Sequence, residues 1–172
     1  MVRSMVVAGV VAVGLLSVVP ARADVVTFAR ISGWEAYGGT ANDGQQVCGI
    51  STRGGGRWIG IKYYQGDSAL TVQLSKTSWR VPNGLHTKVT MQFDEESPWT
   101  ATATGSISNG TAFLEFDIPR RAIGQFLGEF KAGDKMFVRF PNEPKIDDWV
   151  VDLEGTTAIA EKLVDCIQAL GN

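Results

Sequence analysis

Short stretches of alternating apolar and polar residues recur along most of the chain. In Ala69–Ser75, for example, Leu70, Val72 and Leu74 share one face and polar residues occupy the other. Such alternation predicts a β-strand with one buried face. Strands are expected at 25–31, 46–52, 58–64, 69–75, a short segment around Trp79, 86–93, 100–107, 111–118, 136–140 and 149–153.

Turn signals separate these expected strands. Pro82-Asn-Gly84 and Asn109-Gly110 contain Asn-Gly pairs, which tolerate the positive φ angles of a tight hairpin turn. Residues 34–44 contain Gly38-Gly39 and end in Asn-Asp-Gly, so we expect a loop there. Arg53-Gly-Gly-Gly-Arg57 is expected to be a hairpin tip between its neighbouring strands.

Two segments show helical spacing instead. The first has apolar residues at i, i+3, i+4 and i+7, namely Ile123, Phe126, Leu127 and Phe130. We expect this helix to begin near Pro119, with Asp117 as its cap, and to end at Gly133. The second helix should follow Gly155, with Thr156 as its cap. Its apolar face consists of Ile159, Leu163, Cys166, Ile167 and Leu170.

This pattern of many short strands and few helices predicts an all-β fold. We expect an antiparallel β-sandwich or small barrel with one short internal helix and a C-terminal helix. The sequence contains no internal repeat and no linker-like segment. Residues 24–172 should therefore form a single domain.

The first 23 residues have the features of a cleaved signal peptide. Arg3 precedes an apolar run from Met5 to Val19, and Ala21-Arg-Ala23 supplies small residues for cleavage before Asp24. The run is shorter than the roughly 20 residues of a membrane-spanning helix. We expect export to the bacterial periplasm or beyond it, with no integral membrane segment after cleavage; an uncleaved N-terminal anchor is the alternative.

The composition narrows the classes of partner. The chain is 44% hydrophobic and 20% charged, as expected for a globular protein, and its formal net charge is -2. Removing Arg3 and Arg22 with the leader makes the rest more acidic still. Nucleic-acid affinity depends on Lys and Arg that neutralise phosphates, so this balance argues against a nucleic-acid partner.

The sequence contains two cysteines, Cys48 and Cys166. In an exported domain such a pair favours a disulfide over two free thiols. The bridge would connect an early strand to the last helix. Two buried thiols are the alternative, and no neighbouring residues suggest a catalytic cysteine.

Few residues suggest catalysis or metal binding. His86 is the only histidine, so a zinc site would lack its usual nitrogen and sulfur ligands. No Gly-x-Ser-x-Gly segment supports a Ser-His-Asp triad around it. The acidic residues of 94–96 and 147–154 lack the spacing of a calcium loop and are expected to be solvated. We therefore expect no cofactor, no metal and no catalytic residue.

One strand offers a candidate binding face. Trp58, Lys62 and Tyr64 alternate with apolar residues, so they should share the face opposite the core. Aromatic residues are enriched at recognition surfaces, and this face could hold a sugar, a peptide or a protein. The alternative is that a helix or second sheet covers the rings. The Gly54-Gly55-Gly56 loop, flanked by arginines, could hold a phosphate, but it lacks the P-loop sequence and a following helix, which favours a plain hairpin tip.

The exported leader, the segment from Trp34 to Cys48-Gly-Ile50 and the strand-Gly-helix ending at Cys166 together resemble the invasion-associated locus B family. Members typically carry a cysteine soon after the early tryptophan, which Trp34-Glu-Ala-Tyr37 lacks. The resemblance implies an immunoglobulin-like β-sandwich and a non-enzymatic exported protein of alphaproteobacteria, linked to host interaction or envelope function. It supplies no catalytic residues.

These observations favour an exported protein that binds a protein or envelope component and is not an enzyme. A small periplasmic hydrolase or cell-wall-modifying enzyme that uses His86 or paired carboxylates is the first alternative. A structural envelope subunit is the second. An enzyme should bring His86 close to an acid and a hydroxyl in one concave site, whereas a binding protein should expose an aromatic patch around Trp58 and Tyr64.

Overall fold

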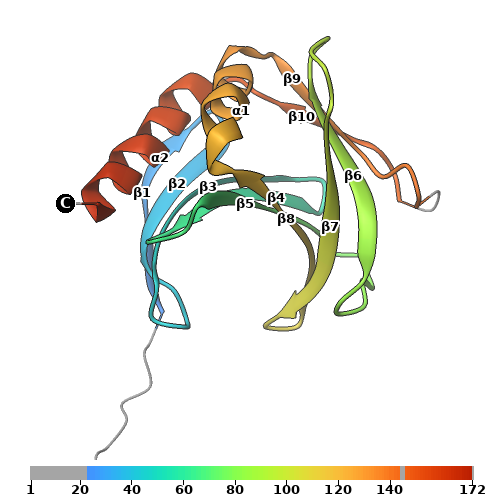
Figure 1. Ribbon diagram of the computed structural model, residues 1–172, viewed down its shortest axis with the longest axis horizontal. Coiled ribbons are helices and arrows are strands. Elements are labelled where there is room, and N and C mark those ends of the chain that lie inside the picture. Colours follow the sequence, from blue (N-terminus) through green and yellow to red (C-terminus); the bar gives the residue numbers. More distant parts are fainter. Residues whose placement is uncertain (1–22, 144–145, 172) are drawn as a thin grey trace, which may run out of the picture.

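Ten strands and two helices make up the computed structural model, which describes residues 23–143 and 146–171 (Figure 1). The strands are β1 (Asp24–Ile31), β2 (Trp34–Thr40), β3 (Gln46–Gly54), β4 (Arg57–Tyr64), β5 (Ala69–Lys76), β6 (His86–Phe93), β7 (Trp99–Ser108), β8 (Thr111–Pro119), β9 (Lys135–Arg139) and β10 (Trp149–Asp152). The helices are α1 (Arg120–Ala132) and α2 (Thr156–Leu170). Residues 1–22 of the expected signal peptide lie outside the described residues.

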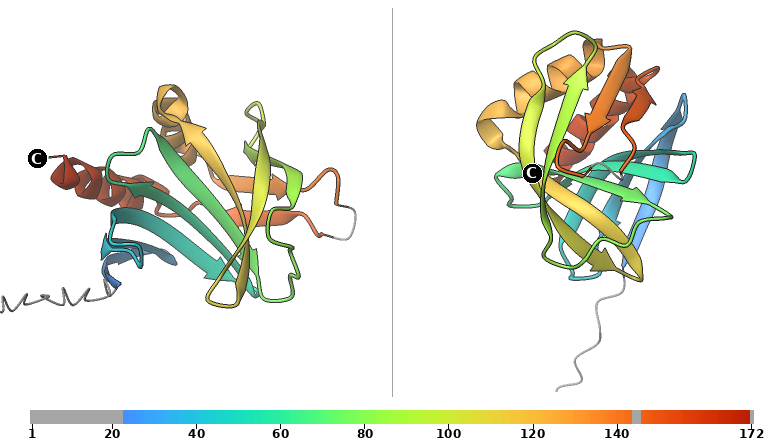
Figure 2. Two further views of the ribbon diagram at one scale, coloured as in Figure 1. Left: turned by 60° about the horizontal axis from the view of Figure 1, so that its bottom comes forward. Right: turned by 90° about the vertical axis from the view of Figure 1, so that its right-hand side faces the viewer.

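All ten strands belong to one antiparallel sheet in the order β1-β2-β3-β4-β5-β8-β7-β6-β9-β10. The sheet curls strongly, as Figures 1 and 2 show. Its two ends meet where the indole nitrogen of Trp34 donates to the carbonyl oxygen of Asp152 at 3.3 Å. The predicted all-β fold with an internal and a C-terminal helix is confirmed. Its sandwich-like shape is formed by a single continuous sheet.

Both helices lie over the same side of the curved sheet (Figure 1). Helix α2 packs on β1, β2 and β3, and α1 packs on α2, β5 and β8. Phe126 and Phe130 are the fully buried residues of the apolar face predicted for α1. Phe130 contacts Trp34 edge to face with ring centroids 5.1 Å apart, so α1 closes the core against the start of β2.

The predicted disulfide between Cys48 and Cys166 is present, with Cα atoms 5.9 Å apart and a sequence separation of 118. It joins β3 to α2. On the neighbouring strand β2, Gly38 pairs with Cys48 and lies against the sulfur of Cys166. A Cβ atom at position 38 would be 2.9 Å from that sulfur, so the absence of a side chain makes room for the bridge.

The prediction of a loop at 34–44 is wrong for its first part, because residues 34–40 form β2. Trp34, Ala36 and Gly38 are buried, and they alternate with the partly exposed Glu35 and Tyr37. Because Gly38 has no side chain, a prediction based on hydrophobicity does not detect this alternation. The turn follows at 41–45, where the amide nitrogen of Ala41 donates to the carbonyl of Gln45.

The predicted short strand around Trp79 is also wrong, since residues 77–85 contain no strand. Trp79 is buried because its ring stacks on Trp149 at 5.3 Å and meets Phe140 edge to face at 5.6 Å. Its hydrophobicity therefore reflects a tertiary aromatic cluster rather than a strand.

Both predicted helix caps are wrong as well. Asp117 lies in β8 and accepts a hydrogen bond from the Thr71 hydroxyl at 2.9 Å, while Pro119 occupies the cap position of α1. Gly155, at φ +83°, precedes α2, and the Thr156 hydroxyl donates to the carbonyl of Leu153 at 2.7 Å. Within the described ranges, no helix is both long and apolar enough to cross a membrane.

Candidate functional site

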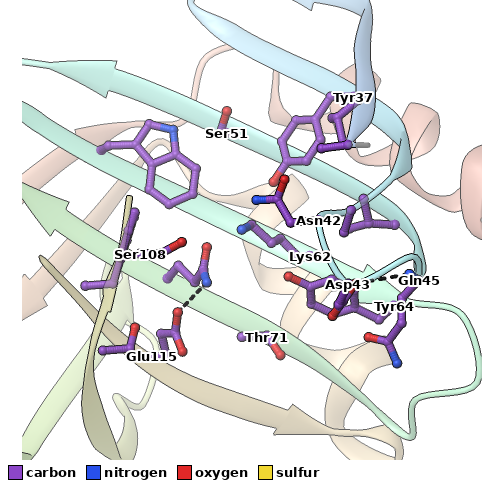
Figure 3. A pocket seen from close by; sticks show the side chains of 18 of the residues that line it. Tyr37, Asn42, Asp43, Gln45, Ser51, Lys62, Tyr64, Thr71, Ser108 and Glu115 are labelled. Atoms are coloured by element: carbon purple, nitrogen blue, oxygen red, sulfur yellow. Dashed lines mark hydrogen bonds between the residues drawn. The ribbon is translucent and has the colours of Figure 1, made fainter. Parts of the chain in front are cut away.

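The face of the sheet that points away from the helices forms an open groove of about 860 Å³ (Figure 3). Strands β1 to β5, β7 and β8 contribute side chains to it, together with the loop at 41–45. The groove exists because the sheet curls, which turns a flat polar surface into a concave one (Figure 1).

All three residues of the predicted binding face, Trp58, Lys62 and Tyr64, line this groove. Their neighbours Ile59 and Ile61 are buried in the core, as the alternation along β4 predicted. The rings are not covered by a helix or by a second sheet among the described residues, and each of the three side chains is partly exposed. The structure thus brings the predicted residues together; their role in binding stays a prediction.

Two aromatic rings lie over glycines on the floor of the groove. Trp58 covers Gly60 on its own strand, and Tyr37 covers Gly49 on the neighbouring strand β3. Any larger residue at either glycine would collide with the ring above it. The glycines therefore make room for the two rings.

A polar row crosses the floor between these rings. Ser51, Gly60, Gln73 and Glu115 are register partners on β3, β4, β5 and β8. The side-chain nitrogen of Gln73 donates to the Glu115 carboxylate (Figure 3). Gln73 is only 9% exposed and Ser51 only 5%, so this row is a buried polar layer beneath an open groove.

Three buried polar atoms that face this region lack a hydrogen-bond partner among the described residues. They are the Tyr37 hydroxyl, the Gln73 carbonyl oxygen Oε1 and the Ser106 hydroxyl. Buried polar groups are normally paired, and an unpaired one costs about 1–3 kcal/mol. The floor of the groove therefore holds donors and acceptors that no described protein group satisfies.

Lys62 places one cation in the middle of the groove (Figure 3). Its ammonium lies 5.6 Å from the centre of the Trp58 ring, a cation–π contact. Burial lowers the pKa of Lys62, and the nearby Glu115 carboxylate partly offsets this effect. No ion pair of Lys62 occurs in the part of the chain that the structure describes.

The tyrosines of the groove stay neutral at physiological pH. Burial raises the pKa of Tyr37 well above its usual value, and Tyr64 adds to the increase. Burial also raises the pKa of Tyr64, followed in effect by the carboxylates of Asp43, Glu115 and Asp67. Both hydroxyls can therefore donate as well as accept a hydrogen bond.

His86 lies outside the groove, in a shallow pocket of about 350 Å³ at the start of β6. Its Nδ1 atom is 3.3 Å from the Thr104 hydroxyl. No carboxylate lines that pocket among residues 23–143 and 146–171. The combination of histidine, acid and hydroxyl that an enzyme would need is not assembled there.

The acidic clusters have structural roles. The Asp94 carboxylate accepts hydrogen bonds from the backbone nitrogens of Asp134 and Lys135, at 2.9 and 2.8 Å, and so anchors the start of β9. Asp152 forms an ion pair with Lys135 at 2.6 Å. The described residues contain no group of acidic, histidine or cysteine side chains that could hold a metal ion.

Sequence reasoning missed Tyr37, Gln73, Glu115 and Ser106 as groove residues. Gln73 had a usable signal, because it is a polar position between Val72 and Leu74 on a strand that was correctly predicted. Tyr37 fell in the segment assigned to a loop. Nothing in the local sequence indicates that β5 pairs with β8, which is the pairing that joins Gln73 to Glu115.

Comparisons with known proteins give one informative result. No protein-family model matches the sequence. No curated protein matches it either. The structure is similar to that of invasion associated protein B from Bartonella henselae, with a TM-score of 0.59 and 14% sequence identity. The superposition covers 83% of this chain and 99% of the other. It confirms the resemblance noted in the sequence, and at this identity what it establishes is a shared fold.

Proposed function

We propose that this is an exported, non-enzymatic binding protein whose groove holds a saccharide. The observation that carries the proposal is the floor of the groove, where the rings of Trp58 and Tyr37 lie over glycines near unpaired hydrogen-bonding atoms. Pyranose rings have apolar C–H faces that pack on aromatic rings, and hydroxyls that both donate and accept. Sites that combine aromatic walls with a few placed polar groups are typical of small-ligand binding.

An extended peptide fits the groove less well. Peptides commonly bind to a sheet by adding a strand to a free edge. The floor here consists of β3, β4, β5 and β8, each of which already pairs with strands on both sides. Its backbone groups are therefore not available to a new strand, and recognition must use side chains.

Export is supported by the disulfide and by the leader predicted from the sequence. Disulfides persist in oxidising compartments such as the periplasm and the extracellular space. The Bartonella protein with the similar fold is named for its association with invasion. We place the protein in the periplasm or outside the cell, where envelope and host-surface glycans provide saccharide ligands.

The test is a glycan array probed with the purified protein and two variants. Trp58→Ala removes a floor ring of the groove. Phe28→Ala is the matched control, because Phe28 is an exposed aromatic side chain that does not line the groove. We expect Trp58→Ala to weaken retention at least tenfold, a loss of about 1.4 kcal/mol, and Phe28→Ala to leave it unchanged.

Absence of any retained saccharide, or equal retention by both variants, would contradict the proposal. The bound saccharides should also be recovered and weighed by mass spectrometry. Intact saccharides agree with simple binding, whereas shortened ones would favour the hydrolase alternative. A defined oligomer that binds no saccharide would favour the structural envelope subunit.

A further inference from the structure

A second pocket of about 790 Å³ adjoins the groove and differs from it in charge. Both are lined by Arg53, Trp58, Lys62, Gln73 and Phe113, so the two spaces are continuous. The charged side chains of this second pocket are all basic: Arg53, Arg57, Lys62, Lys76 and Arg80. No carboxylate lines it in the described part of the chain. We call it the basic pocket.

Only one of these cations forms an ion pair with a carboxylate among the described residues. Lys76 forms an ion pair with Asp147 at 3.0 Å, and the Asp147 side chain is 71% exposed. Arg80 donates to the backbone carbonyl of Trp79 at 3.0 Å, which leaves its charge uncompensated. Like charges that line one pocket repel one another, and an anion between them would relieve that repulsion.

Arg57 provides a second, independent observation. Its guanidinium lies 5.7 Å from the centre of the Trp149 ring, which fixes its position. Its Nε atom is buried and has no hydrogen-bond partner among the described residues. A guanidinium N–H that lacks a partner is costly to bury, and an oxyanion is a strong partner for a guanidinium.

The glycine-rich hairpin tip forms one wall of the basic pocket. Gly54 and Gly56 line it, and Gly55 and Gly56 have φ angles of +57° and +73°, as a tight turn requires. The segment is thus the hairpin tip that its sequence favoured. The turn also places the flanking arginines Arg53 and Arg57 beside Lys76 and Arg80 of the following strand and loop.

We propose that the basic pocket binds a phosphate group of a phosphorylated saccharide whose sugar part occupies the groove. Several cations lining one pocket match a doubly charged group with three terminal oxygens better than a single carboxylate. A polyanion does not fit, because the adjoining groove is lined by Glu35, Asp43 and Glu115. The negative charge of the ligand must therefore be confined to the part that enters the basic pocket. This inference rests on the proposed saccharide function.

The test is a calorimetric titration of the purified protein with three probes: a hexose, the same hexose as its 6-phosphate, and inorganic phosphate. We expect the hexose phosphate to bind at least tenfold more tightly than the hexose. The double variant Lys76→Gln, Arg80→Gln should remove that advantage and leave hexose binding unchanged, because both residues line the basic pocket and neither lines the groove. Arg80 is exposed and Lys76 is partly exposed, so the variant should fold. Arg121→Gln on α1 removes a similar exposed charge outside both pockets and is the control.

Each outcome bears on one of the two proposals. Equal affinity for hexose and hexose phosphate contradicts phosphate binding in the basic pocket and still supports saccharide binding in the groove. Inorganic phosphate that binds as tightly as hexose phosphate supports the basic pocket and contradicts the groove as a saccharide site. If Arg121→Gln weakens phosphate binding as much as the double variant does, only the net charge of the protein matters. That result contradicts phosphate binding in the basic pocket.

Discussion

Trp58 lies over Gly60, two positions further along β4, and its ring fills the space that a side chain at position 60 would need. The ammonium of Lys62 lies 5.6 Å from the centre of the same ring. Gly60, which has no side chain, therefore determines where the Trp58 ring can lie in the groove.

Gly60→Ala should displace the Trp58 ring. The added methyl group would collide with the ring, which is partly exposed and can swing away from the sheet. We expect a loss of about 1–3 kcal/mol in the free energy of unfolding, measured by urea denaturation. The indole N–H signal of Trp58 should also shift in a ¹H–¹⁵N spectrum.

Gly128→Ala is the control for this variant, because it makes the same change at an exposed helix position with no atom within 4 Å of the new methyl group. It should stabilise α1 by about 0.5–1 kcal/mol. An unchanged indole signal in Gly60→Ala would show that the ring does not depend on the glycine.

Cys166→Ser should destabilise the protein strongly. The bridge from Cys48 spans a separation of 118 residues, and the chain-entropy model assigns about 4–5 kcal/mol to a loop of this size. Urea denaturation with and without a reductant measures the effect. Reductant should destabilise the wild-type protein by a similar amount and leave Cys166→Ser unchanged. A wild-type protein that is insensitive to complete reduction would contradict the prediction.

Gly38→Ala should be more destabilising while the disulfide is present than in its absence. The new methyl carbon would lie 2.9 Å from the sulfur of Cys166 and 3.3 Å from the carbonyl oxygen of Val47. We expect a loss of about 1–3 kcal/mol from overpacking. In a Cys166→Ala background the loss should be smaller, and a double-mutant cycle gives the coupling. Additive effects of the two substitutions would mean that the sulfur is not the obstacle.

Lys62→Met should stabilise the protein near neutral pH. Burial lowers the pKa of Lys62 below its usual value of 10.5, so the folded state binds the proton less tightly than the unfolded state. The charged lysine therefore destabilises the fold at neutral pH. The penalty fades as pH rises through the folded pKa toward 10.5, because the amine is then neutral in both states.

The gain from Lys62→Met should consequently be largest near pH 7 and smaller near pH 10.5, as urea denaturation at the two pH values would show. Lys88→Met is the matched control, since Lys88 is exposed on β6 and lies outside the groove. A gain that grows with pH would contradict the argument.

The strand pattern, the apolar faces of both helices and the disulfide partners could all be predicted from the sequence. The period of two along β4 and β5 and the helical spacing of Phe126 and Phe130 are local consequences of backbone geometry. The two errors of strand assignment have tertiary causes. Gly38 lies in a strand that pairs with β1 and β3, and its empty side makes room for the disulfide. Trp79 is buried by Trp149 and Phe140.

By itself the sequence determined that Trp58, Lys62 and Tyr64 share a face, because neighbouring residues of a strand point to opposite sides of the sheet. It could not determine what lies beside them. Gln73 meets Glu115 only because β5 pairs with β8, and β6 and β7 are passed over in that pairing. Such long-range register depends on how the whole core packs. The groove and the basic pocket are therefore properties of the tertiary structure, built from residues whose individual roles the chain does not reveal.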